Sequence, residues 1–269
     1  MWALGVVVLP FAGEALAAEG VISNRLGMRL VYIAPGSFEM GSPPTEKGRN
    51  PDEERHTVTL TGGFFLGETE VTRAQWQQLM NSSPAGNDGC GPDCAVTQVA
   101  WEDCLVFIGR LNALEKTDRY RLPTEAEWEF ACRAGAQTAF SAGAISALHC
   151  QNDPVLDAIG WYCGNSGFLP QRVAQKAPNA WGLYDMHGNV QEWCQDRAAW
   201  RSPISGRTGV FTDTYRSGVI DPLSLAGDRR VLRGGAWNSS VQDCRAAKRI
   251  VFQPSVRRTY IGFRVARSR

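Results

Sequence analysis

Histidine is scarce in this chain, and the motifs of several common enzyme classes are missing. The 269 residues include three histidines, His56, His149 and His187, and no two of them have the spacing of a metal-binding pair. A multi-histidine zinc or iron site is therefore not expected. The sequence also lacks a G-x-S-x-G elbow, a phosphate-binding P-loop and a G-x-G-x-x-G that opens a helix. Hydrolase, kinase and dehydrogenase functions thus have no supporting motif.

The chain has neither an excess of charge of one sign nor a long hydrophobic run. It carries 28 Lys and Arg residues against 27 Asp and Glu residues, a formal net charge of +1. Because phosphate binding relies on clustered basic residues, a nucleic-acid partner is not expected. The one conspicuous apolar run, residues 2–12, is too short to span a bilayer, so an integral membrane protein is not expected either.

The N-terminus has the features of an export signal. Trp2 to Ala12 are almost all apolar, and Ala15-Leu16-Ala17 has the small-x-small pattern of a signal-peptidase site. No basic residue precedes the run, which is consistent with a start inside a longer signal. The alternative is a buried N-terminal strand. The sequence therefore predicts a signal peptide over residues 1–17, a domain over residues 18–269, and a secreted or periplasmic location.

Eight cysteines fit an oxidising compartment. The short spacings within Cys90/Cys94 and Cys150/Cys163 predict local disulfides. Cys104 and Cys132 lie on predicted helices, where each could equally be a buried thiol. The pairing of the remaining cysteines cannot be deduced from spacing alone.

The periodicity predicts short strands and few helices. Apolar or alternating stretches predict strands at residues 30–33, 37–40 and 56–60, and the charged stretch 42–54 between them predicts a loop. Helical spacing recurs over residues 101–114, and Thr124 and Glu127 form a capping box that begins another helix. After Gly135, periodicity almost vanishes, but five tryptophans recur, at positions 161, 181, 193, 200 and 237, and these loops are expected to pack around the rings. The sequence predicts one loop-rich α+β domain with short antiparallel strands and a few helices.

Five ordered blocks carry a family resemblance. They are GM at 27–28 with PGSFEMGS at 35–42, ETEVT at 68–72, RLPTEAEWE at 121–129, NAWGLYDMHGNVQEW at 179–193, and RGGAW at 233–237 with GFR at 262–264. Together they resemble the formylglycine-generating enzyme (sulfatase-modifying factor) family. The resemblance implies a C-type-lectin-like fold. The family includes oxidases, sulfoxide-synthase domains, kinase-linked modules and binding proteins, so the resemblance does not fix one activity.

The resemblance also implies where a copper site would lie. Oxidases of the family hold copper(I) with two cysteines spaced C-x4-C, because soft thiolates suit this ion. Counting back from Pro254 and the GFR block, those positions fall on Val241 and Ala246, with Cys244 between them. The next cysteine upstream is Cys194, so no gap restores the pair, and copper is not expected. No catalytic residue is predicted, except Cys244 if the protein is an enzyme; otherwise Cys244 either pairs with Cys194 or is simply buried.

A calcium site is the second feature that the resemblance implies. In the family, the segment that matches residues 185–192 binds calcium through two side chains and two backbone carbonyls, which here are those of Asp185, Gly188, Val190 and Glu192. A hard cation prefers such oxygen ligands, and a glycine-containing turn lets carbonyls converge. The alternative is that Asp185 and Glu192 are ordinary turn and strand residues. A second family calcium site, upstream, has no clear match around residues 161–168.

The last block alternates framework residues with positions that look variable. Ile250, Val251 and Phe252 form an apolar triplet in a stretch expected to be an exposed loop, and a short buried strand is the alternative. The pattern is similar to the C-terminal variable region of diversity-generating-retroelement proteins, which display changing side chains on a lectin-like fold. The sequence therefore predicts a recognition surface within residues 238–261, formed by Asn238, Ser239, Ser240, Arg245, Arg249, Ile250, Val251, Phe252, Arg258, Thr259 and Tyr260. For Arg245 and Arg249 the alternative is burial against a carboxylate such as Glu192 or Asp196.

These observations favour a binding function over a catalytic one. The hypothesis is an exported family member without the copper-binding cysteine pair that acts as a ligand-binding module for a protein, peptide or glycan, with calcium as its cofactor. The alternative is a formylglycine-generating oxidase that converts a sulfatase cysteine to formylglycine, or another oxidative activity of the family.

Overall fold

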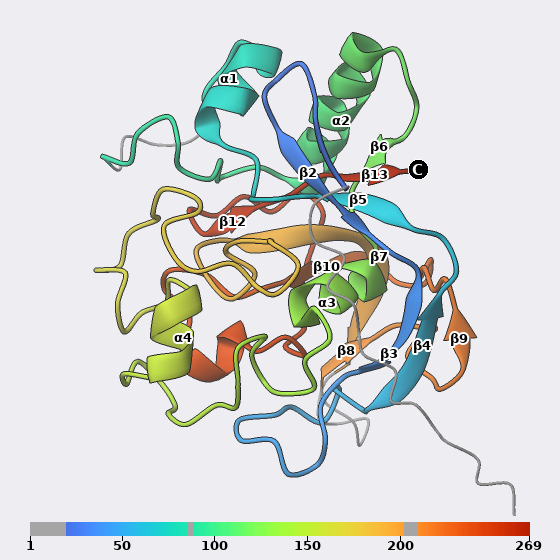
Figure 1. Ribbon diagram of the computed structural model, residues 1–269, viewed down its shortest axis with the longest axis vertical. Coiled ribbons are helices and arrows are strands. Elements are labelled where there is room, and N and C mark those ends of the chain that lie inside the picture. The colour runs from blue at the N-terminus through green and yellow to red at the C-terminus, as the bar shows by residue number, and fades with distance from the viewer. Residues whose placement is uncertain (1–19, 85–88, 202–208) are drawn as a thin grey trace, which may run out of the picture.

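All the described strands except β7 are short, and most of them pair with strands far away in the sequence. A computed structural model describes residues 20–84, 89–201 and 209–269 (Figure 1). The predicted signal peptide, residues 1–17, lies outside the described residues. In chain order, the elements are β1 (Val21–Ser23), β2 (Arg29–Ile33), β3 (Gly36–Met40), β4 (His56–Leu60), β5 (Phe64–Gly67), α1 (Arg73–Met80), α2 (Trp101–Glu115), β6 (Tyr120–Arg121), α3 (Glu125–Arg133), α4 (Pro154–Ile159), β7 (Gln191–Arg201), β8 (Gly209–Phe211), β9 (Val219–Ile220), β10 (Arg229–Arg233), the 3-10 helix η2 (Val241–Cys244), β11 (Ile250–Phe252), β12 (Ile261–Gly262) and β13 (Ala266–Ser268).

The described strands form three small sheets. One has the order β1-β2-β5-β13-β6, so that the last strand of the chain lies between two early ones. The second has the order β11-β10-β7-β12, with β8 paired to β7, and the third has the order β3-β4-β9. Most of the pairs are antiparallel, and β12 with β7 and β4 with β9 are parallel. The predicted loop-rich α+β architecture is confirmed.

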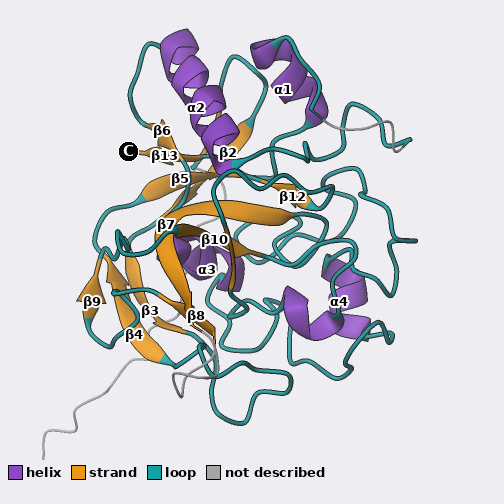
Figure 2. Ribbon diagram, turned by 180° about the vertical axis from the view of Figure 1, so that it is seen from behind, coloured by secondary structure: helices purple, strands orange, loops and turns teal. Residues whose placement is uncertain are grey.

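Helix α3 lies at the centre of the molecule, whereas α1 and α2 pack together outside the first sheet, the one that contains β2 and β5 (Figure 2). The predicted capping box begins α3: the Thr124 hydroxyl accepts from Glu127 N at 3.1 Å, and the Glu127 carboxylate accepts from Thr124 N at 2.8 Å. Ala134 ends the helix in the left-handed conformation. All nine residues of α3 are buried, because it packs against β3, β7 and β10. None of the described helices is long and apolar enough to cross a membrane.

The long stretch after α3 is ordered by buried side chains, as the tryptophan content predicts. Trp193 is fully buried, and its Nε1 donates to Val99 O at 3.0 Å. Trp161, Trp181 and Trp237 are half-buried in the loops. Trp200 differs: it lies near the end of β7 and is 51% exposed.

Two disulfides close loops, one between α1 and α2 and one around α4. Cys90–Cys94 and Cys150–Cys163 are both formed, which confirms the two local predictions. Cys104, Cys132, Cys194 and Cys244 are free thiols, and all four are buried. The suggested Cys194–Cys244 pairing is therefore wrong, and burial of each thiol in the apolar interior is the correct alternative.

Asp153 fixes the start of α4. Its carboxylate accepts from the Ser146 and Ala147 N–H groups at 2.7 and 3.0 Å, and from Val155 N and Leu156 N, both at 3.1 Å. Burial disfavours the charged form, but the N–H donors outweigh it and lower the pKa of this carboxyl below its ordinary value. One side chain thus joins the helix start to the preceding loop.

Replacement of Asp153 by alanine is expected to lower the free energy of unfolding by about 2 kcal/mol at pH 7, because the cap and buried hydrogen bonds are lost. Asp153→Asn is the matched variant, and its free energy of unfolding is expected to fall by less than that of Asp153→Ala. Because the folded-state pKa is depressed, the contribution of the charge is present above the unfolded-state pKa of about 3.9 and is lost as the pH falls through the folded-state value. Urea denaturation at pH 7 and pH 3 measures this, and equal stability of wild type and Asp153→Ala at pH 7 would contradict it.

Candidate functional site

The predicted recognition block, residues 238–261, is partly built into the second sheet. β11 pairs antiparallel with β10, with Val251 opposite Val231, and β12 pairs with the start of β7. Val251 is only 6% exposed, and Ile250 and Phe252 are half-buried against the core. The expected exposed apolar loop at 250–252 is therefore wrong, because backbone pairing with β10 makes this triplet a short buried strand.

Arg245 is a framework residue and not a ligand contact. Its guanidinium is fully buried and bonds Glu53 through Nη1 to Oε2 at 2.6 Å and Nη2 to Oε1 at 2.8 Å. Nη1 also contacts Glu46 Oε1 at 2.7 Å, and Nη2 donates to Gly48 O at 2.8 Å. Burial disfavours the charged form, but these carboxylates raise the pKa of Arg245 above its ordinary value. The burial alternative is correct, although the partner is neither Glu192 nor Asp196.

Arg249 has the same kind of environment. It is 2% exposed, and its Nε and Nη2 donate to the two oxygens of Glu125 at 2.7 and 2.8 Å. Its guanidinium also lies over the Tyr215 ring, 4.0 Å from the centroid. Asp196, a predicted alternative partner, instead accepts from the N–H groups of Glu125 and Ser224. Both arginines are therefore removed from the recognition surface.

The positions matched to the copper cysteines are closed to solvent. Val241, Ala246 and the intervening Cys244 are all fully buried. Burial raises the pKa of the Cys244 thiol well above its ordinary value, so the thiolate that binds copper(I) is disfavoured. A substrate sulfur could not approach Cys244 without local opening.

Two loops carry the exposed part of the block. Asn238, Arg258 and Thr259 are exposed, and Tyr260 is half-buried. The Trp237 Nε1 donates to Thr259 O at 3.2 Å and joins the two loops. We call Trp237, Asn238, Arg258, Thr259 and Tyr260 the display face.

Ser239 and Ser240 lie behind the display face and contribute little to its exposed surface. Ser239 is 9% exposed, and its hydroxyl accepts from Ala236 N at 2.9 Å within the turn. Ser240 is half-buried just before η2. The structure thus brings Asn238, Arg258, Thr259 and Tyr260 together and separates them from the other predicted contacts.

An apolar pair beside the display face was not predicted. Phe168 and Leu169 are 57% and 50% exposed. Ser166 connects their loop to the display face, because its Oγ donates to Trp237 O at 2.6 Å and accepts from Phe168 N at 3.1 Å. The sequence signal is an apolar pair between Gly167 and Pro170 in an otherwise polar loop.

The predicted calcium ligands lie in a buried group of carboxyls. Both oxygens of Glu192 are engaged: Arg264 Nε and Trp128 Nε1 donate to Oε2 at 2.6 and 2.7 Å, and Arg264 Nη2 donates to Oε1 at 2.7 Å. Asp185 Oδ2 accepts from Ala174 N at 2.7 Å, whereas Oδ1 is buried without a hydrogen-bond partner. Gly188, at φ +130°, lies so close to Trp161 that an added Cβ would be 2.1 Å from its carbonyl oxygen.

Glu70 adds a third carboxyl that the sequence did not reveal. Its Oε1 accepts from Asn189 Nδ2 at 3.1 Å, and its Oε2 is buried without a hydrogen-bond partner. Burial, followed by the charge of Asp185, raises the pKa of Glu70 well above its ordinary value, and burial raises the pKa of Asp185 to about 6. One guanidinium, that of Arg264, faces three carboxyls here. Among the residues that the structure describes, no group of three or more His, Cys, Asp or Glu side chains is arranged to hold a metal by itself.

Substitution of a buried arginine is expected to destabilise the protein strongly, whereas substitution in the display face is expected to leave its stability almost unchanged. Arg245→Ala leaves Glu53 buried without its partner and is expected to lower the free energy of unfolding by about 3–5 kcal/mol. Arg258→Ala removes an exposed guanidinium and is expected to change it by less than about 0.5 kcal/mol. Urea denaturation of both variants tests this, and an equal loss in the two would contradict the division.

Comparison with known proteins places the whole described domain in one family. Residues 22–269 match the sulfatase-modifying factor enzyme 1-like domain. The chain is 30% identical over 322 residues to the formylglycine-generating enzyme of Bos taurus, covering 95% of this chain and 79% of the relative. It is 26% identical over 290 residues to the chaperone protein LppX of Paenibacillus barcinonensis, covering 89% of each.

Some relatives are much longer. The chain is 28% identical over 280 residues to the serine/threonine-protein kinase Pkn1 of Chlamydia trachomatis, and it spans only 40% of that protein.

Solved structures share the fold over nearly the full chain. The Treponema denticola variable protein 1 superposes with a TM-score of 0.77 at 27% identity, covering 93% of this chain and 99% of that one. PvdO from Pseudomonas aeruginosa superposes with a TM-score of 0.73 at 27% identity, covering 93% and 98%. The predicted C-type-lectin-like fold is confirmed, and the chain belongs to the formylglycine-generating enzyme (sulfatase-modifying factor) family.

Proposed function

We propose that this protein is an exported ligand-binding member of the family, and that it recognises a protein, peptide or glycan through the display face. The observation that carries the proposal is the division of the C-terminal block. Its framework arginines are buried in ion pairs, whereas Asn238, Arg258 and Thr259 point outward from two loops joined by Trp237.

The chemistry of the site argues against formylglycine formation. Copper(I) in the catalytic relatives needs two accessible thiolates, and the matched positions here are the buried side chains of Val241 and Ala246. Cys244 is a single thiol, fully buried and protonated.

The composition of the display face suits recognition. Trp, Tyr and Arg are enriched at binding hot spots, and a face whose loops are already fixed loses little entropy on binding. The structural likeness to a protein called a variable protein supports the idea that this fold can carry changing side chains on a constant framework. Diversification by a retroelement is part of this proposal; a template repeat and a reverse transcriptase gene beside the coding gene would support it, and their absence would remove it.

Secretion or a periplasmic location is supported by the two formed disulfides, which persist in oxidising compartments.

Calcium is proposed as a structural cofactor beside this face. Asp185 fits the ion, because its Oδ1 is a buried carboxylate oxygen without a hydrogen-bond partner, and the carbonyls of Gly188 and Val190 would complete the oxygen set. Glu192 could bind calcium only if it lost one of its hydrogen bonds, because Arg264 and Trp128 donate to both of its oxygens. A divalent cation would offset the excess of buried carboxyls around Arg264.

Chelation is expected to lower the melting temperature of the protein. A ligand at 100 times its Kd stabilises the folded state by about 2.7 kcal/mol, and about 2–4 °C is lost per kcal/mol in a domain of this size. Asp185→Ala is expected to abolish the difference between calcium and EDTA, and Asp213→Ala, which removes an exposed carboxylate, is expected to keep it. Calorimetry with and without EDTA measures this, and an unchanged wild-type melting curve would contradict the proposed calcium site.

Binding is tested with the mature chain, residues 18–269, panned against a random peptide phage library and a glycan array. Arg258→Ala/Thr259→Ala is expected to weaken the binding of the recovered ligands by at least about tenfold, which corresponds to about 1.4 kcal/mol. The matched control is Arg216→Ala/Ser217→Ala, an exposed pair just before β9, which lies on the opposite side of the molecule from β12 (Figure 1). No enriched ligand, or equal binding by both variants, would contradict the display face.

The oxidase alternative has its own assay. The mature chain is incubated with copper(I), oxygen and a peptide that carries the sulfatase-type Cys-x-Pro-x-Arg sequence, and the aldehyde is sought by mass spectrometry. No product is expected. Turnover above that of a Cys244→Ser control would overturn the proposed function.

A further inference from the structure

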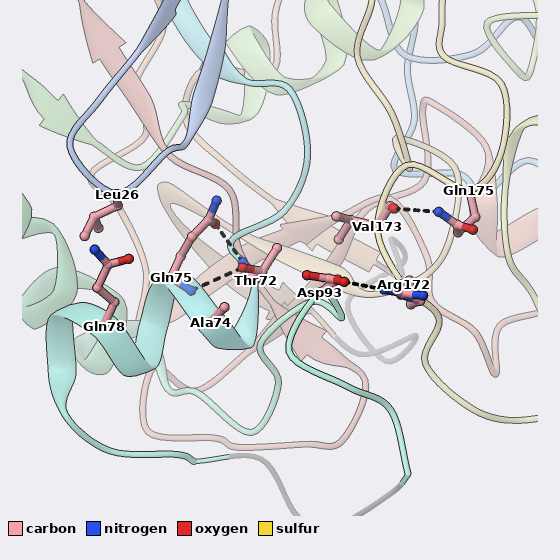
Figure 3. A pocket seen from close by; sticks show the side chains of 9 residues that line it. All are labelled: Leu26, Thr72, Ala74, Gln75, Gln78, Asp93, Arg172, Val173 and Gln175. Carbon is pink, nitrogen blue, oxygen red and sulfur yellow. Dashed lines mark hydrogen bonds and ion pairs between the residues drawn. The ribbon is translucent and has the colours of Figure 1, made fainter.

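A hollow of about 540 Å³ lies between α1 and the loop of residues 171–175, and none of the display-face residues lines it (Figure 3). This volume falls within the range of roughly 300–1,000 Å³ that is usual for ligand sites. Its polar lining includes Gln75, Gln78, Asp93, Arg172 and Gln175, and Leu26 and Val173 add apolar walls. Neither the family resemblance nor the proposed function uses this hollow.

The walls of the hollow are fixed to each other by the backbone. Val173 N donates to Asp93 O at 3.0 Å, and Cys94 forms an isolated bridge with Arg172. The Cys90–Cys94 disulfide closes the same loop, and Ala74 N at the start of α1 donates to Pro92 O at 2.9 Å. The hollow therefore exists before any ligand arrives, which lowers the entropic cost of binding.

The charges of the lining cancel, so the hollow does not select an ion. Arg172 pairs with Asp93 across it. The first turn of α1 offers no anion site, because Thr72 Oγ1 accepts from Gln75 N and Gln75 Oε1 accepts from Thr72 N. A neutral polar ligand fits this environment best.

Three glutamine side chains supply the hydrogen-bonding groups. Each carries both a carbonyl acceptor and an NH₂ donor, the same pair that a peptide group presents. No hydrogen bond of the described residues uses the Gln78 amide, Gln75 keeps its Nε2 donor, and Gln175 keeps its carbonyl oxygen. No aromatic ring lines the described hollow, so the stacking platform that favours a sugar ring is missing there.

The loop that leads into one wall of the hollow carries exposed apolar side chains. Phe168 and Leu169 lie in it a few residues before the wall, and they are 57% and 50% exposed. Phe168 has φ +59°, a conformation that is costly for a bulky residue. Gln171 holds the loop in this shape, because its Nε2 donates to Ser166 O and Leu169 O at 2.8 and 3.1 Å. Strain that holds apolar side chains in water is typical of a contact surface.

We propose that this hollow is a second binding site that takes an extended polypeptide segment of a protein partner. The glutamine amides would pair with the main chain of that segment, and Phe168 and Leu169 would contact its apolar side chains. The site does not rest on the display face, and each of the two can fail without the other.

The test separates the hollow from the display face. A random twelve-residue phage library is panned on the folded mature chain that carries Arg258→Ala/Thr259→Ala, so that peptides which need these two residues of the display face are not recovered. The recovered peptides are synthesised, and their affinities are measured by fluorescence anisotropy. Gln78→Ala/Gln175→Ala changes only the lining of the hollow and is expected to weaken binding at least about tenfold. Phe168→Ser/Leu169→Ser is expected to weaken binding as well, through the apolar side chains of the peptide. Gln151→Ala/Leu225→Ser is the matched control, with an exposed glutamine and a leucine that is 69% exposed, and is expected to change it less than about twofold.

Each remaining outcome overturns the inference. Peptides that bind the hollow variants as tightly as the control show that they lie elsewhere, and a library without enriched clones shows that the hollow takes no polypeptide. The same variants are also tested on a glycan array. Sugar binding that depends on Gln78 and Gln175, without peptide binding, would assign the hollow to a glycan and contradict the proposal. All the substituted side chains are exposed, so circular dichroism is expected to show unchanged folding in every variant.

Discussion

Buried pairs of arginine and carboxylate are the interaction on which this structure depends. Arg233, Arg245, Arg249 and Arg264 are nearly inaccessible to solvent, and each pairs with a glutamate far earlier in the chain. The separations run from 72 residues for Arg264 and Glu192 to 199 residues for Arg245 and Glu46. An isolated charge in the interior is very costly, so the chain has few ways to collapse that leave all of these groups paired.

The same pairs explain how one segment can contain fixed and free positions side by side. Between β10 and β12, the guanidiniums anchor the backbone from inside, and they do so without help from the outward-facing side chains. The exposed positions therefore carry little of the folding energy. A surface supported in this way can change its chemistry without changing its shape, which is the physical requirement for a recognition module.

Local features were predictable from the sequence, and features that depend on distant partners were not. The capping box of α3 and the two short-range disulfides need only residues within a few positions or one loop of each other. The burial of Ile250–Phe252 depends on β10, and no local pattern distinguishes such a triplet from an exposed apolar loop. Likewise, the polar stretch 42–54 is a loop as predicted, but Glu53 within it is fully buried because Arg245 lies opposite. The partners of Arg245 and Arg249, and the role of Glu70 beside Asp185, come from the fold alone.

The position of β13 affects when this protein can fold. Residues 266–268 form the strand between β5 and β6, so the first sheet stays open, with two unpaired edges, until these residues have been synthesised. An N-terminal fragment that emerges from the ribosome cannot complete its core. Folding of this sheet is thereby postponed until β13 has been synthesised. A truncation that removes residues 266–268 would keep the sequence of every earlier element but leave the first sheet without the strand that joins β5 to β6.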